Sequence, residues 1–165
     1  WFDGVTNGSG SYVGYGTASH GTFGETVVVH DGRQSMPVFY SNAGLPYYSE
    51  VERTFDSARN WAAHGADTLC LYFQGVAASA GNSAEGLYLT VKDSSGESKT
   101  VAHPDPAATT VTEWQPWITP LTEFTSAGVD VTSVESIVIG VGNRTNPTVG
   151  GTGVVYIDDI SNGCQ

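Results

Sequence analysis

Residues 150–160 read G-G-T-G-V-V-Y-I-D-D-I, and this segment decides the fold that we expect. Three glycines within four residues predict an open loop, and the β-branched and aromatic run 154–157 that follows predicts a strand. Side chains alternate along a strand, so Asp158 and Asp159 should project to opposite faces. One carboxylate should therefore face the layer on which the strand packs, where a calcium ion or an arginine would have to compensate its charge.

Eight further short runs have the composition of strands and are separated by turn residues. They are residues 26–29, 35–41, 48–55, 68–74, 87–91, 98–101, 114–118 and 137–141. Helix signals are confined to residues 58–64 and 121–127, and residues 4–21 form a glycine-rich stretch typical of a surface loop. The sequence therefore predicts an all-β fold: a β-sandwich jelly roll of about nine short antiparallel strands with two short helical turns.

The composition fits one domain and excludes two classes of function. A chain of 165 residues can bury roughly 70% of the surface that it exposes when unfolded. Six Lys and Arg against 17 Asp and Glu give a net charge of −11, which excludes nucleic-acid binding through phosphate contacts. It also argues against an anionic membrane surface, and no run approaches the ~20 apolar residues of a membrane span. We expect a single domain, residues 1–165, that binds neutral ligands or divalent cations.

The two cysteines, Cys70 and Cys164, leave two interpretations open. They are either unrelated small residues or a disulfide that ties the C-terminal end to a central strand. A disulfide that closes so long a loop would stabilise the fold by up to ~4–5 kcal/mol in the chain-entropy model, and it would indicate export. The chain opens on Trp1-Phe2-Asp3 with no apolar signal segment, so we expect a domain excised from a larger secreted protein.

The sequence lacks the common motifs for catalysis. H-E-x-x-H, G-x-S-x-G and the G-K-[ST] phosphate loop do not occur, and the four histidines have no metal-ligand spacing. Glycoside hydrolysis needs two carboxyl groups that face each other across a cleft. Glu50 and Glu52 instead share one face of a predicted strand, beside Arg53. We therefore expect a protein that is not an enzyme.

Aromatic side chains are the strongest candidates for a binding function. The chain has four Trp and eight Tyr, and neutral sugars stack on aromatic rings while polar side chains bind their hydroxyl groups. Trp61, Trp114 and Trp117 occupy positions that we expect in the core. Tyrosines at a turn or on outward strand faces, with nearby polar residues, are the predicted carbohydrate-binding residues: Tyr47, Tyr48, Tyr72, Tyr88, Arg53 and Gln74.

Oxygen-bearing side chains near loops suggest a structural calcium site. Calcium takes roughly six to eight oxygen ligands, often from distant loops. The predicted ligands are Asp158 at the end of the last strand, Asp31 in the H-D-G turn, and Asn143 in the G-N-R-T-N-P loop. Asp159 and Asn146 are the alternatives beside them.

Four segments, in this order, resemble carbohydrate-binding modules with the galactose-binding-like jelly-roll fold. They are V-V-V-H-D-G-R-Q-S-M (27–36), R-N-W-A-A-H-G-A-D-T-L-C-L-Y-F-Q-G (59–75), E-W-Q-P-W-I-T-P-L (113–121) and G-T-G-V-V-Y-I-D-D-I (151–160). The resemblance spans most of the chain from about residue 23. It implies a non-catalytic domain of a secreted or surface polysaccharide-degrading protein. It also implies a structural calcium with an aspartate matching Asp158 among its ligands; the acidic pair that completes the site near the N-terminus has only Asp3 or Glu25 as a substitute here.

The sequence thus predicts a non-catalytic, calcium-stabilised carbohydrate-binding module that attaches a secreted or surface protein to a polysaccharide. Its partners would be a polysaccharide or oligosaccharide and a linked catalytic domain in the precursor, with no nucleic acid and no membrane span. Two alternatives stay open. One is a structural or self-assembling subunit of a cell surface or filament. The other is a small jelly-roll glycoside hydrolase or polysaccharide lyase, which two facing carboxylates would indicate.

Overall fold

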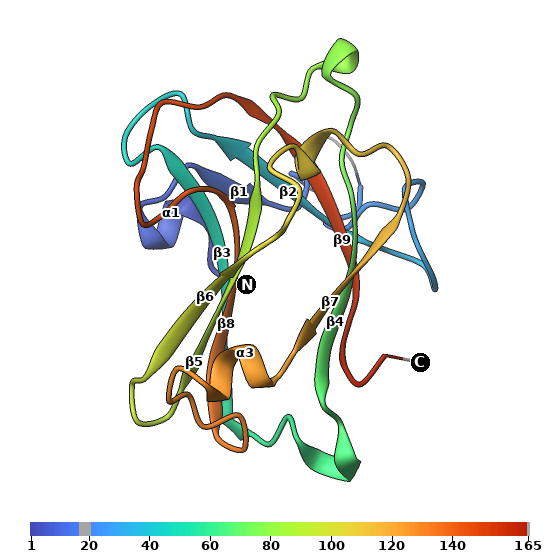
Figure 1. Ribbon diagram of the computed structural model, residues 1–165. Helices are drawn as coiled ribbons and strands as arrows, with labels where there is room; N and C mark the ends of the chain where they lie inside the picture. The colour runs from blue at the N-terminus through green and yellow to red at the C-terminus, as the bar shows by residue number, and fades with distance from the viewer. Residues whose placement is uncertain (17–20, 165) are drawn as a thin grey trace.

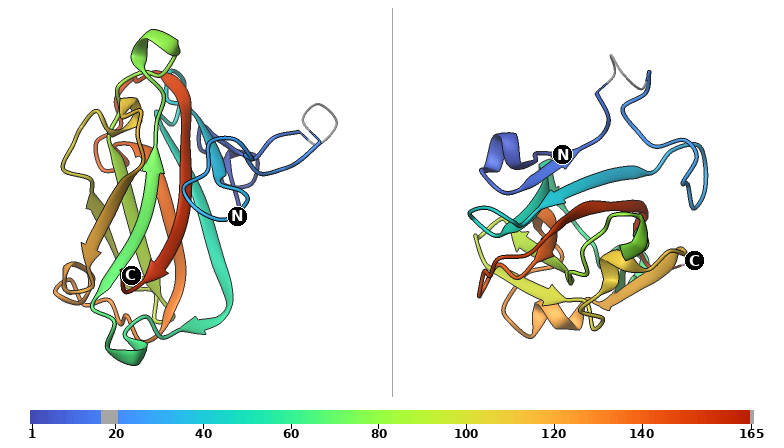
Figure 2. Two further views of the ribbon diagram at one scale, coloured as in Figure 1. Left: turned by 90° about the vertical axis from the view of Figure 1, so that its right-hand side faces the viewer. Right: turned by 90° about the horizontal axis from the view of Figure 1, so that it is seen from above.

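The computed structural model describes residues 1–16 and 21–164, in which two antiparallel sheets pack face to face (Figures 1 and 2). In chain order the strands are β1 (Ser11–Val13), β2 (Met36–Ser41), β3 (Tyr48–Arg59), β4 (Thr68–Gln74), β5 (Leu87–Asp93), β6 (Ser98–Ala102), β7 (Gln115–Pro120), β8 (Val134–Gly142) and β9 (Thr152–Asn162). One sheet has the order β1-β2-β9-β4-β7 and the other β3-β8-β5-β6. This arrangement confirms the predicted jelly-roll sandwich.

In residues 1–16 and 21–164, helical structure is limited to short elements. They are α1 (Gly4–Asn7), α3 (Thr122–Thr125) and 3₁₀ turns at Ala63–Gly65, Ala78–Ala80 and Ala108–Thr110. α3 confirms the second predicted helical turn. Within the described part of the chain, no helix has the length and apolar character needed to cross a membrane.

The core lies between the two sheets, where apolar side chains at alternate positions meet. Leu69, Leu71 and Phe73 of β4 and Leu87 and Leu89 of β5 are each at most 1% exposed. These are the positions that alternation assigns to the inner faces. Burial of such side chains contributes roughly 1.5–3 kcal/mol each, which makes this layer the main source of stability.

The N-terminal segment differs from the predicted loop and strand. Residues 26–29 are not a strand, because the Glu25 carboxylate accepts the N–H groups of Thr26 and Val27 (2.7 and 2.6 Å) and curls the chain around itself. β1 supplies the ninth strand instead, within the stretch predicted as a loop; residues 17–20 of that stretch lie outside the described residues. β1 pairs with β2, and Phe2 bridges to Glu52 of β3, so this segment joins the two sheets along one side (Figures 1 and 2).

The helical turn predicted for residues 58–64 is wrong in its first half. β3 continues to Arg59, which pairs with Val134 of β8 after a register shift that begins at Thr54. Only Ala63–Gly65 is helical. The N–H of Trp61 donates to the carbonyl of Val131 (2.8 Å), and its buried indole packs into the core as predicted. Tertiary pairing and packing therefore override the local helix signal.

The paired carboxylates of β9 do not enter the core. The pairing of β9 with β4 shifts register beyond Asp158, and Asp159 has a φ of 48°. This bulge breaks the alternation of side chains, so Asp159 is exposed although Val155 and Ile157 on its expected face are buried. The expectation of an inward carboxylate that needs a cation is therefore wrong.

Cys70 and Cys164 form a disulfide, with their Cα atoms 5.6 Å apart. It ties the end of β9 to β4 in the five-stranded sheet. The second of the two interpretations of the cysteines is therefore the correct one.

Asp93 fixes the turn between β5 and β6, and its pKa leads to a prediction of how stability depends on pH. Its side chain is 1% exposed; Oδ1 accepts bonds from Ser95 and from the N–H of Glu97, and Oδ2 accepts the N–H of Asp130 (2.8 Å). These bonds, first that from Asp130 and next that from the Ser95 hydroxyl, lower the pKa of Asp93 to about 2.

Because this pKa is lower in the folded than in the unfolded state, the stabilisation by Asp93 is present above about pH 4 and lost as the pH falls towards about 2. Thermal melting from pH 7 to pH 2 should show Asp93→Asn less stable than the wild type at pH 7, with a smaller loss between pH 4 and pH 2. Asp56→Asn, at an exposed position of β3, is the matched control and should follow the wild type. Parallel curves for wild type and Asp93→Asn would contradict the assignment.

Candidate functional site

The predicted carbohydrate-binding residues do not gather on one surface. Tyr72 and Gln74 lie on the outer face of the five-stranded sheet, whereas Tyr48 and Tyr88 belong to the four-stranded sheet on the other side of the sandwich. A shared platform of Tyr72 and Tyr88 is therefore ruled out. Tyr72 also stacks on His30, with ring centroids 3.6 Å apart, so that face of its ring is already covered.

Tyr47 and Arg53 share neither the outer sheet face of Tyr72 nor that of Tyr88. Tyr47 follows the cis Leu45–Pro46 bond in the turn before β3 and has a φ of 68°. Arg53 lies next to Phe55 in a separate cavity. Of the predicted residues, Tyr48 and Tyr88 are the two that lie together on the outer face of the four-stranded sheet.

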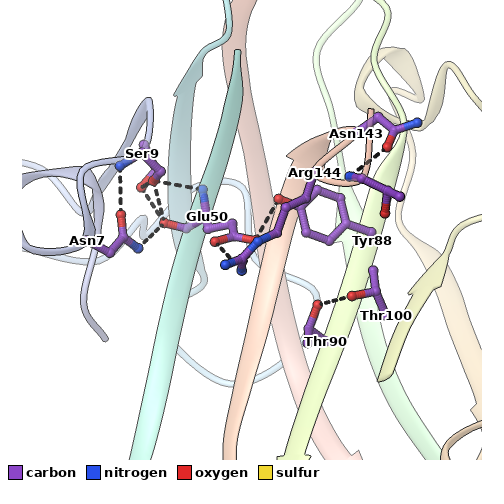
Figure 3. Close-up of polar contacts among 10 residues, drawn as sticks. Asn7, Ser9, Glu50, Tyr88, Thr90, Thr100, Asn143 and Arg144 are labelled. Atoms are coloured by element: carbon purple, nitrogen blue, oxygen red, sulfur yellow. Dashed lines mark hydrogen bonds and ion pairs between the residues drawn. The ribbon is translucent and has the colours of Figure 1, made fainter. Parts of the chain in front are cut away.

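Three side chains form a polar network on the outer face of the four-stranded sheet (Figure 3). The hydroxyl of Tyr88 donates to Oε1 of Glu50 at 2.8 Å. Nη1 of Arg144 donates to Oε1 and Oε2 of the same carboxylate at 2.9 and 3.0 Å. The guanidinium carbon of Arg144 lies 5.7 Å from the ring centroid of Tyr48, a cation–π geometry. β3, β5 and the loop after β8 thus meet at one carboxylate.

Burial makes this network electrostatically strong. The side chain of Glu50 is 8% exposed and that of Arg144 49% exposed. Burial, and next the negative charge of Glu50, raise the pKa of Tyr88 well above its ordinary range. Burial acts to lower the pKa of Arg144, but the Glu50 carboxylate outweighs it and the pKa lies above its usual value. Tyr88 therefore stays protonated, and Arg144 stays charged.

Local sequence explains how the network is accommodated. Tyr88 pairs directly with Gly140 of β8, and a Cβ atom at that position would collide with the tyrosine ring. The missing side chain lets the ring lie flat on the sheet. On the other side, the carbonyl of Glu50 accepts bonds from Asn7 and Ser9 (3.1 and 3.2 Å), so the N-terminal segment holds β3 in place (Figure 3).

A groove of about 490 Å³ runs beside the network, over β5, β6 and the loop after β8. Its polar lining includes Thr100, His103, Asn143, Arg144 and Thr148. The hydroxyl of Thr100 is paired with that of Thr90 at 2.7 Å (Figure 3). Hydroxyl, amide and guanidinium groups above a tyrosine can bind a polyhydroxylated ligand. Sequence reasoning named Tyr88, which lines the groove but is only 2% exposed, and did not name Arg144 or Thr100.

The predicted calcium ligands do not come together as a set. Asp158 and Asp31 are neighbours, since Oδ2 of Asp158 accepts the N–H of His30 at 3.0 Å and faces that of Asp31. Asn143 lies at the far end of the sandwich, where Oδ1 accepts the N–H groups of Thr145 and Asn146. Residues 1–16 and 21–164 contain no group of three His, Cys, Asp or Glu that could hold a metal. Main-chain N–H groups already bond both oxygens of Asp158 and Oδ1 of Asp31, and with only two carboxylates together this environment does not fit a strong calcium site.

The two candidate N-terminal carboxylates have the same environment. Asp3 accepts the N–H groups of Val5 and Val13, and Glu25 accepts three consecutive N–H groups and the hydroxyl of Tyr15. Both residues are buried. They serve as local folding contacts.

Comparison with known proteins identifies the fold. No protein-family model and no curated protein sequence matches the chain. An exo-β-agarase structure matches 84% of this chain with a TM-score of 0.61 and 14% identity, and the chain spans 21% of that protein. A family 30 carbohydrate-binding module matches 86% of this chain, with a TM-score of 0.60 and 15% identity over 74% of its own length. The family 30 module of the cellulosomal cellulase Cel9D-Cel44B of Clostridium thermocellum matches 83%, with a TM-score of 0.57 and 17% identity over 78% of its length. The chain therefore has the β-sandwich fold of carbohydrate-binding modules.

Proposed function

We propose that the protein binds a polysaccharide without catalysing a reaction, through the groove on the outer face of the four-stranded sheet. The observation that carries this proposal is the 490 Å³ groove beside the Glu50–Tyr88–Arg144 network. The fold shared with carbohydrate-binding modules supports it.

The chemistry of the groove suits sugar hydroxyl groups. A guanidinium has five N–H donors, and only Nη1 of Arg144 binds Glu50 among the described contacts, so the other nitrogens can donate to a ligand. The hydroxyls of Thr100 and Thr148 can both donate and accept. Because the buried carboxylate fixes Arg144, less side-chain entropy is lost on binding.

Two observations favour binding over hydrolysis. Glu50 is bonded to both Arg144 and Tyr88, which hold it as a structural anion. Glu85, the carboxylate that lines the groove, accepts the N–H of Gly151 at 2.7 Å. Neither is arranged with the other as the acid and base that a glycosidase needs.

The proposal extends to a secreted or cell-surface protein in which this domain holds a linked catalytic domain on its polysaccharide. The disulfide supports export, because such bonds persist in oxidising compartments. The agarase match supports a linked catalytic domain, because the matching part is about a fifth of that protein. The proposal retains calcium, with Asp31 and Asp158 as its ligands. The ion would link the turn that contains Asp31 to β9. Since N–H groups already bond Asp158, we expect weak binding.

The test is a titration against a panel of neutral polysaccharides that includes agarose and soluble cellulose derivatives, with calcium and with chelator. We expect saturable binding to one glycan class and no new reducing ends. Thr100→Trp should fill the groove and lower the affinity at least about tenfold, while Ser126→Trp, which places the same side chain after α3, should bind like the wild type.

Four results would overturn parts of the proposal. New reducing ends would indicate a hydrolase or lyase. Unchanged affinity in Thr100→Trp would place the site elsewhere. Absence of binding to every glycan, with concentration-dependent assembly in sedimentation, would favour the self-assembling surface subunit. A melting temperature equal with calcium and chelator would remove calcium from the proposal.

A further inference from the structure

A second cavity, of about 540 Å³, opens between the sheets away from the groove. It lies where β3 ends, β8 begins and β9 passes its bulge, and Leu69, Ile137 and Ile160 form its apolar wall. The remaining wall combines aromatic side chains with two arginines. This cavity plays no part in the glycan site described above.

The lining of this cavity is basic, although the chain as a whole is acidic. Arg53 and Arg59, two of six Lys and Arg, line it, while among the described residues none of the 17 Asp and Glu does so. Neither arginine has a carboxylate within 4.0 Å in residues 1–16 and 21–164; the ion pairs there involve other residues. In a protein with a net charge of −11, two such cations without an ion pair concentrate positive charge in this cavity.

The two guanidinium groups are held against one aromatic ring. Their central carbons lie 5.7 Å (Arg53) and 5.9 Å (Arg59) from the ring centroid of Phe55. Each contact attracts its guanidinium to the ring face, while the two like charges repel each other. An anion in the cavity would reduce this repulsion and could accept N–H donors from the guanidinium groups, which bind carboxylate, sulfate and phosphate groups well.

Aromatic walls complete the cavity. Phe55 meets Trp61 edge to face at 6.4 Å, and the buried indole fixes the orientation of the ring. Trp1 and Phe55 are half-buried, so part of each ring faces the cavity, and Asn60 and Asn162 add amide groups. Rings, amides and guanidiniums together are the set that binds a sugar ring bearing an anionic group.

A bulge in β3 creates this arrangement. Thr54 pairs with Ser136 and Arg59 with Val134, so β3 has extra residues between two close points of β8. The extra length turns the edge strand and brings Phe55 and Arg59 to the same cavity. The feature depends on tertiary pairing, which explains why the sequence pattern indicated a helical turn instead.

We infer that this cavity, lined by Arg53 and Arg59, binds an acidic sugar residue, one that carries a sulfate ester or a carboxylate. The inference rests on the proposed glycan binding for its ligand class but uses a different surface. A neighbouring cavity shares Trp1 and Arg53 and is lined by Asp158 and Asp159, so the anion is excluded from that side and directed towards Arg59. The protein would then bind a polysaccharide with both neutral and acidic residues.

The experiment compares three soluble probes: a neutral galactan, its sulfated counterpart, and an oligogalacturonate. Calorimetric titrations are run on the wild type, on Arg53→Gln/Arg59→Gln, and on the charge-matched control Arg33→Gln/Lys99→Gln. At low salt the cavity variant should lose at least about tenfold in affinity for the acidic probe, because two charge-assisted contacts are removed. The control should lose less than about twofold. Raising the salt should weaken wild-type binding of that probe.

The outcomes separate this inference from the proposed function. Binding of the sulfated probe alone, or of the oligogalacturonate alone, assigns the anion as sulfate ester or carboxylate. Neutral-glycan affinity that depends on Thr100 but not on the two arginines supports the groove independently. Equal affinity of the cavity variant and the control for both acidic probes, with equal melting temperatures, overturns the inference and leaves the groove untouched. Absence of acidic-probe binding by the wild type overturns it as well.

Discussion

Removal of the Cys70–Cys164 disulfide is expected to lower the free energy of unfolding by about 2–5 kcal/mol, the largest effect on stability that we predict. The bridge joins residues separated by 94 positions, so in the chain-entropy model its loss should cost a free energy close to the upper end of this range. It also fixes the last residues of β9, which is central in its sheet, next to β4. Urea denaturation of Cys70→Ala/Cys164→Ser against the oxidised wild type measures the difference.

A reducing agent provides the internal control. It should lower the unfolding midpoint of the wild type towards that of the double variant and leave the double variant unchanged. In thermal melting the loss should be on the order of 10 °C for a domain of this size. A difference below about 1 kcal/mol would show that contacts of β9 with β2 and β4 already restrict this end of the chain, and that the entropic account fails here.

Alternation along the strands predicted which residues enter the core. The inner positions of β4 and β5 are buried because a two-residue period allows only one assignment once the apolar face is known. The same period carries no information about which sheet a strand joins. Tyr72 and Tyr88 are both outward, yet they lie on opposite sides of the molecule, so a platform inferred from their shared pattern could not be correct.

Hydrogen bonds from side chains to the main chain explain the errors in the N-terminal third. The run 26–29 has strand composition, but the preceding Glu25 captures its N–H groups before a partner strand can. In α1 and β1, Asp3 plays the same part by binding the N–H groups of Val5 and Val13, the second of which lies ten residues away. Such contacts depend on the three-dimensional path of the chain and have no periodic signature.

Tyr48 and Tyr88 were named from the sequence as candidate binding residues, which stays a prediction, whereas Arg144 was passed over as one residue of a polar loop. Alternation places Glu50 on the face opposite the core residue Val51, so its burial, and its need for one of the six Lys and Arg as a partner, became clear only from the structure. Choosing among the six required the fold, because Arg144 is 94 positions from Glu50.

Arg144→Gln is expected to have the largest effect on function, a loss of at least about tenfold in affinity for the neutral glycan. The guanidinium is the charged donor of the groove, and a hydrogen bond from a charged group contributes about 1.5–3 kcal/mol. The variant should also lower the free energy of unfolding by about 1–3 kcal/mol, because Glu50 stays buried without its cation. This is below the roughly 3–5 kcal/mol of a fully buried pair, since Arg144 is half-exposed and solvent screens its charge.

Glu50→Gln/Arg144→Gln separates the two effects. The amide oxygen at position 50 can still accept the hydrogen bond from the Tyr88 hydroxyl, and the neutral amide no longer needs a cation, so stability should recover most of the loss of the single variant. Glycan affinity should stay low, because no guanidinium lines the groove. Denaturation and titration of all three proteins test both statements. If the double variant regained affinity together with stability, Arg144 would act only by holding the sheet surface in shape, and the other polar residues of the groove, such as Thr100 and Thr148, would have to bind the ligand.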